Sequence, residues 1–146
     1  MLRESLIEIF ERDLNKLKDE IGLYSDESKL WIVDKQISNS AGNLCMHLIG
    51  NLNHFIGATL GNTEYVRERD KEFSLKNIPR KELLGNIEKT KKVVGDTLKQ
   101  VDETIFEKEF PLEVMGKRYP TGFFLIHLTA HLNYHLGQIN YHRRLL

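Results

Sequence analysis

The chain has 146 residues, enough for one domain with its own core and too few for two domains of ordinary size. Lysine and arginine number 21, and so do aspartate and glutamate, so no net charge attracts a nucleic acid or an anionic membrane surface. The single cysteine, Cys45, excludes an internal disulfide and fits a reducing compartment. We therefore expect one cytoplasmic domain over residues 1–146, without a nucleic-acid or membrane partner.

Residues 2–21 place apolar side chains at intervals of three and four with charges between them, which predicts a one-sided helix. The same charges exclude the continuous apolar core of a signal peptide. Gly22 is the expected stop of the helix. The mixed stretch that follows, LYSDESKLWIVDKQISNSAGN, holds the only tryptophan and is expected to be an ordered loop.

A second helix is expected to begin at a cap, Ser40 or Asn39, and to continue to Gly61. A charged connector, TEYVRERDKEFSLKN, then leads to Pro79, which suits the first turn of a third helix. That helix is predicted to run through Val101 with its lysines facing outward.

The next segment, FEKEFPLEVMGKRYPTG, alternates over short runs around Met115, Gly116 and Lys117, which favours a small hairpin or an irregular excursion. Its prolines forbid a continuous helix. Thr121 opens a fourth predicted helix, which runs to the end of the chain.

Four amphipathic helices bury their apolar faces most simply against one another, so the predicted fold class is all-α, an antiparallel four-helix bundle. The connections after the first and third helices are long. Because long connections permit crossovers, they leave the order of helix directions open.

Four of the six histidines lie between residues 127 and 142. On a helix, His131 and His135 lie about 40° apart and one turn apart, so they can share a metal ion. His127 and His142 lie roughly 6–16 Å along the axis from that pair, at about 1.5 Å per residue. We therefore expect both to lie outside the ligand set.

A third ligand must come from another helix, and His47 borders the apolar stripe of the second helix, whereas His54 turns toward its polar flank. Asn51, one turn after His47, could approach the metal or orient a ligand. The alternative is that no metal binds and these histidines only pack. Cys45 falls on the apolar side and is expected to be a small core residue.

The segments NLCMHLIGN, VRERDKEFS and HLTAHLNYHLGQINYHRRLL together resemble the DinB-like superfamily, also called YfiT-like metal-dependent hydrolases, over nearly the whole chain. The resemblance implies a homodimeric four-helix bundle with a divalent metal, nickel or zinc, on His47, His131 and His135. Some members of that superfamily are transferases of low-molecular-weight thiols such as bacillithiol or mycothiol, and others are hydrolases or isomerases.

Three neutral imidazoles leave an open coordination position, which is typical of catalytic metal sites. We therefore expect a metal-dependent thiol transferase or small-molecule hydrolase; the alternative is a non-enzymatic dimeric bundle that binds metal or a ligand through a vestigial site. No catalytic residue follows from the resemblance. The connector offers acids as bases and two arginines for a substrate carboxylate, although such charge runs are usually solvated: Glu64, Asp70, Glu72, Arg67 and Arg69.

The pair Gly137 and Gln138 follows the second ligand of the fourth helix. The glycine would let another helix approach closely, and the glutamine could bond to backbone or to a ligand histidine.

Overall fold

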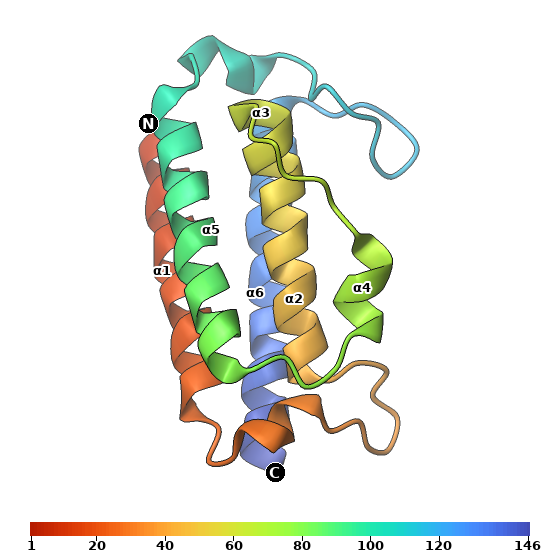
Figure 1. Ribbon diagram of the computed structural model, residues 1–146. Coiled ribbons are helices and arrows are strands. Elements are labelled where there is room, and N and C mark those ends of the chain that lie inside the picture. Colours follow the sequence, from red (N-terminus) through yellow and green to blue (C-terminus); the bar gives the residue numbers. More distant parts are fainter.

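The computed structural model describes all 146 residues, and the protein is all-helical, as predicted. Four long helical segments lie side by side (Figure 1). Their bounds are α1 (Leu2–Leu23), α2 (Ala41–Leu52), α5 (Arg80–Gln100) and α6 (Thr121–Leu145). None of the helices combines the length and apolar character that a membrane span needs.

The second segment is longer than α2 alone. It continues through a π-helical turn (Asn53–Ala58) into α3 (Thr59–Gly61), where the sequence predicts a regular helix. At the start of this turn the Asn53 amide donates to the Ile49 carbonyl and to the Thr90 hydroxyl of α5, both at 2.8 Å. A side chain that hydrogen-bonds to a backbone carbonyl of its own helix can accompany a local departure from α-helical geometry.

The directions of the long helices differ from simple alternation. α1 and α6 run one way, and α2 and α5 run the other way (Figure 1). Both α1 and α2 pack against α5 and α6. The pairs α1–α5 and α2–α6 are therefore antiparallel neighbours, whereas α1–α6 and α2–α5 are parallel neighbours. The crossover therefore lies in the connection after α3, residues 62–79, and not after the first or third predicted helix.

Residues 62–79 also contain a helix that the sequence did not indicate, α4 (Arg69–Ser74), which lies beside α2 (Figure 1). Two other segments expected as irregular hold 3₁₀ turns, Glu27–Trp31 and Glu103–Glu107. The segment before α6 is an excursion without a regular strand, and it carries two isolated antiparallel bridges, Glu109–Pro120 and Val114–Lys117.

Local capping explains several helix boundaries. The Ser40 side chain accepts a hydrogen bond of 3.2 Å from the Asn43 amide at the start of α2. Asn62 ends α3 in the left-handed region, with a φ of 53°. Pro79 and Pro120 directly precede α5 and α6, where a missing amide proton costs nothing.

A single cluster of buried apolar side chains fills the space between the long helices. Cys45 belongs to it and is fully buried, as the sequence predicts for a packing residue. Burial raises the pKa of its thiol to about 12, so the reactive thiolate is suppressed near neutral pH.

Leu17→Ala tests the core directly, because Leu17 is 0% exposed on the inner face of α1. We expect the substitution to lower the free energy of unfolding by about 2–5 kcal/mol, through lost burial and the cavity left behind. The matched control is Leu23→Ala at the end of the same helix, where the side chain is 60% exposed and the change should stay within about 0.5 kcal/mol. Urea denaturation measures both, and equal losses would contradict this assignment of the core.

Candidate metal centre

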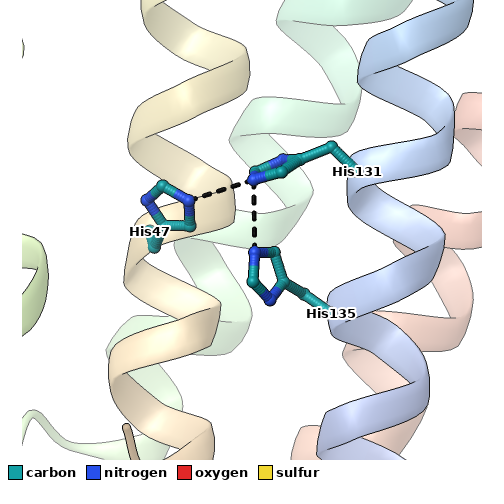
Figure 2. A group of neighbouring side chains, drawn as sticks. All are labelled: His47, His131 and His135. Atoms are coloured by element: carbon teal, nitrogen blue, oxygen red, sulfur yellow. Dashed lines mark hydrogen bonds between the residues drawn. The ribbon is translucent and has the colours of Figure 1, made fainter. Parts of the chain in front are cut away.

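The three histidines selected from the sequence come together between α2 and α6. His47 projects from α2 toward His131 and His135, which lie one turn apart on α6 (Figure 2). The Nε2 atom of His131 lies 3.1 Å from Nε2 of His47 and 3.2 Å from Nε2 of His135. Nitrogen ligands about 2.0–2.1 Å from a tetrahedral ion lie about 3.3 Å apart. The spacing therefore matches a shared metal ion.

The outer nitrogen of His47 fixes the orientation of its ring. His47 Nδ1 lies 3.0 Å from Oε1 of Glu72 in α4. A carboxylate can only accept a hydrogen bond, so Nδ1 carries the proton and donates it. The neutral ring then presents the lone pair of Nε2 to the space shared with His131.

His135 is oriented in the same manner from its own helix. Its Nδ1 lies 2.7 Å from Oε1 of Gln138, one turn further along α6. The amide oxygen accepts the Nδ1 proton, which leaves the Nε2 of His135 free to act as a ligand. Of the two roles predicted for Gln138, the bond to a ligand histidine is the one that the structure contains.

His131 lies between the other two rings, and its Nδ1 is buried without a hydrogen-bond partner. The Nε2 atoms of His47 and His135 are both unprotonated, so only Nε2 of His131 can carry a proton between the three rings. That one proton cannot form two full hydrogen bonds, one to His47 and one to His135. Three ring nitrogens that converge around at most one proton form a donor set that suits a cation.

The protonation equilibria of the α6 histidines favour the neutral form. Burial, followed by the neighbouring imidazoles of His135 and His47, lowers the pKa of His131 to about 4. Burial also lowers the pKa of His135, against the opposing effect of its bond to Gln138. Both rings are therefore neutral at pH 7, which metal coordination requires.

Glu72 is held as a carboxylate although it is only 5% exposed. The Arg67 guanidinium donates to both carboxylate oxygens, from Nε at 2.8 Å and from Nη2 at 2.9 Å. Burial by itself raises the pKa of Glu72, but the hydrogen bonds from His47 and Arg67 outweigh it, so the pKa is lowered. A bidentate arginine thus keeps the acceptor of His47 ionised.

Glu72 reaches His47 because α4 docks closely on α2. A Cβ atom at Gly50 would lie 1.9 Å from Oε2 of Glu72, so only glycine leaves room for the carboxylate. The side-chain amide of Asn43 donates to the backbone carbonyls of Glu72 and Leu75, at 2.8 Å each, and so holds the end of α4 in place.

The interpretation of Glu72 as one of several solvated connector acids is therefore wrong. Glu72 is buried and engaged with His47 and Arg67. Its neighbours Glu64 and Asp70 are exposed, as expected for a charge run. Arg69 lies over the Phe73 ring at 5.2 Å and does not contact Glu72. Spacing could not separate Glu72 from these acids, because only the fold of residues 62–79 buries it.

The remaining histidines stay outside the cluster. The ring of His127 stacks on Phe124 at a centroid distance of 5.9 Å. His142 Nδ1 lies 2.6 Å from the Tyr24 hydroxyl oxygen, and His142 Nε2 lies 2.9 Å from the Ile32 carbonyl oxygen. His54 packs against the Phe55 ring. The sequence-based exclusion of these three residues agrees with their positions.

Asn51 is buried, and its Oδ1 has no hydrogen-bond partner, so it does not orient a ligand histidine through that atom. The group of potential ligands comprises His47, His131 and His135, all within 4.8 Å of one another, with no fourth histidine, cysteine or carboxylate. His131 and His135 are half-buried, so one side of the cluster borders solvent.

A family model described as "Protein of unknown function (DUF1572)" matches residues 3–146. No curated protein matches the chain.

Glu72→Gln tests the role of the buried carboxylate. Glutamine preserves the size of the side chain but weakens the bonds to His47 and Arg67, so we expect the affinity for Zn²⁺ to fall roughly 10–100-fold. Isothermal titration calorimetry measures the affinity, and circular dichroism checks that the helices remain. The control is Asp70→Asn, an exposed carboxylate of the same helix, which should bind as the wild type does. Equal affinity in all three proteins would contradict the role of Glu72.

Proposed function

The chain belongs to the family described as protein of unknown function (DUF1572), and from its site we propose that it binds a divalent metal ion. The ion, nickel or zinc, would be held by His47, His131 and His135. The observation that carries the proposal is the convergence of three Nε2 atoms, two of them with lone pairs directed inward by Glu72 and Gln138. Imidazole nitrogen suits both metals.

We assign the site to catalysis and not to structural support. Structural zinc sites are closed by four protein ligands, whereas catalytic sites keep an open position. Here the ligand group has three members, and two of them are half-buried. When bound, such an ion supplies Lewis acidity and lowers the pKa of a thiol or water placed against it at neutral pH.

The residues around the site would orient the histidine ligands. The hydrogen bonds to Glu72 and Gln138 hold two ligand rings, and Arg67 fixes the carboxylate behind His47. Because Glu72 is engaged by His47 and Arg67, its role in this proposal is to orient a ligand histidine.

The reaction class rests on the resemblance to the DinB-like superfamily. We propose a cytoplasmic S-transferase that uses a low-molecular-weight thiol of the bacillithiol type, or a hydrolase of a small molecule, in a four-helix bundle of the DinB-like type. The crossover after α3 and the docked α4 belong to this proposed architecture.

Elemental analysis of the purified protein tests the metal proposal. We expect about one divalent ion per chain in the wild type grown in metal-replete medium, and a loss of that ion in His131→Ala. The matched control is His127→Ala, one turn earlier on α6 and outside the ligand group, which should retain the metal. A wild type without bound metal would refute the proposal.

A thiol-transfer assay tests the reaction class on metal-loaded protein. With bacillithiol or mycothiol and an activated aromatic chloride, we expect turnover that falls to background in His47→Ala and persists in His54→Ala, a variant of the same helical segment. An ester panel under the same conditions tests for hydrolysis. Bound metal without turnover in either assay would favour the non-enzymatic metal-binding alternative.

A further inference from the structure

The side chain of Asn51 is an unpaired polar group in the interior of the protein. It is 7% exposed, and its Oδ1 is buried without a hydrogen-bond partner. Buried acceptors in folded proteins are almost always paired, because an unpaired one destabilises the fold. An apolar residue of similar size would fill the position without that penalty. Packing therefore does not explain the amide of Asn51.

Two contacts between the second helical segment and α6 locate Asn51. The ring centroids of His47 and His131 lie 5.0 Å apart, and so do those of Phe55 and Phe124. The two helical segments are antiparallel (Figure 1), so these contacts bracket Asn51, which lies midway between His47 and Phe55 in the sequence. Asn51 is therefore one turn from the histidine cluster, in the same space between two helices.

The rotation of α2 turns Asn51 toward the core. Each residue advances the helix by about 100°, so Asn51 is rotated about 40° from His47, in the direction of Leu48. Leu48 is fully buried in the apolar core. The amide of Asn51 thus lies on the inner side of the metal ligand of its own helix.

The side chains around Asn51 leave its Oδ1 without a donor. The ring of His127, on the turn of α6 that faces Asn51, stacks on an aromatic neighbour. Arg67 lies over the Phe55 ring, with 5.8 Å from Cζ to the centroid, but its Nε and Nη2 donate to Glu72. A donor for Oδ1 can therefore come only from a molecule that binds beside the histidines.

We infer that Asn51 is a specificity-determining residue that accepts a hydrogen bond from the substrate thiol. This inference rests on the proposed function, in which a thiol binds at a metal ion on His47, His131 and His135. The acceptor selects thiols that carry a donor, a hydroxyl, an amine or an amide N–H, two carbons from the sulfur. A thiol without such a donor leaves Oδ1 unpaired.

The length of one helical turn sets the position of the donor on the thiol. His47 and Asn51 are about 6 Å apart along α2, at about 1.5 Å per residue. With the sulfur level with His47, a hydrogen bond to Oδ1 spans about 2.9 Å of this length. The remainder is roughly 3 Å, which two carbon atoms with bonds of about 1.5 Å can bridge.

The binding of two matched thiols to cobalt-loaded protein tests this role. 2-Mercaptoethanol carries a hydroxyl at the required position, whereas 2-methoxyethanethiol has a methyl ether there and cannot donate. Each thiol is titrated into Co²⁺-loaded protein, and the absorption of the sulfur–cobalt bond reports binding. We expect the wild type to bind 2-mercaptoethanol roughly 3–10-fold more tightly, which corresponds to one net hydrogen bond.

The variant Asn51→Leu should lose this preference and bind the two thiols equally. The matched control is Asn86→Leu in α5, where the side chain lines a cavity on the other side of α2, and it should keep the preference. A wild type that binds both thiols equally would overturn the inference, as would a preference that survives in Asn51→Leu. Those results leave the metal site standing, whereas a protein that binds no Co²⁺, or Co²⁺ without thiol, refutes the proposed function and this role together.

The stability of the metal-free protein separates this role from a structural one. Asn51→Leu should unfold at the same urea concentration as the wild type or at a higher one, because the substitution removes an unpaired buried acceptor. Circular dichroism measures the transition. A water molecule bonded to Oδ1 as a fixed part of the fold would make the substitution destabilising, and that result would overturn the inference.

Discussion

The hydrogen bond from His47 Nδ1 to the Glu72 carboxylate connects the fold to the site. It fixes the tautomer of His47, so the Nε2 lone pair faces His131, and it requires α4 to lie directly on α2. That contact in turn depends on Gly50, because any larger residue would occupy the position of the carboxylate. Arg67 compensates the buried charge with two hydrogen bonds. A buried carboxylate without that partner would cost several kcal/mol, so the four residues form one unit.

The hydrogen bond between His47 and Glu72 also depends on the directions of the long helices. α2 and α5 run parallel, so residues 62–79 must return along the whole length of the molecule (Figure 1). That path brings α4 and Arg67 across the outer face of α2, behind His47. A tight turn after α3 would have left this uncharged helix bare. The crossover therefore covers an apolar surface and also supplies the groups that orient a ligand.

Sequence patterns predicted the four long helices, a cap at Ser40 or Asn39 and the core position of Cys45, because these features depend on local spacing. The structure places the cap at Ser40. The same spacing brought together His47, His131 and His135 across 84 residues of chain. Patterns named Glu72 among the connector acids but could not single it out, since its burial depends on how the charged connector folds against Gly50. They also missed the parallel pairing of α2 with α5, because helix direction depends on the path of the connections. The close helix approach predicted for Gly137 is wrong within this chain, because a Cβ atom there would meet nothing within 4 Å.

α6 contributes to both the core and the site. One of its faces is buried in the core, and another carries His131 and His135 toward α2. The hydrogen bonds to Glu72 and Gln138 set the tautomers of His47 and His135 before any metal binds. Nitrogen-15 NMR of the imidazole rings in metal-free protein measures these tautomers. We expect a protonated Nδ1 and an unprotonated Nε2 in both rings near pH 7, and protonated Nε2 atoms would refute this role of the two hydrogen bonds.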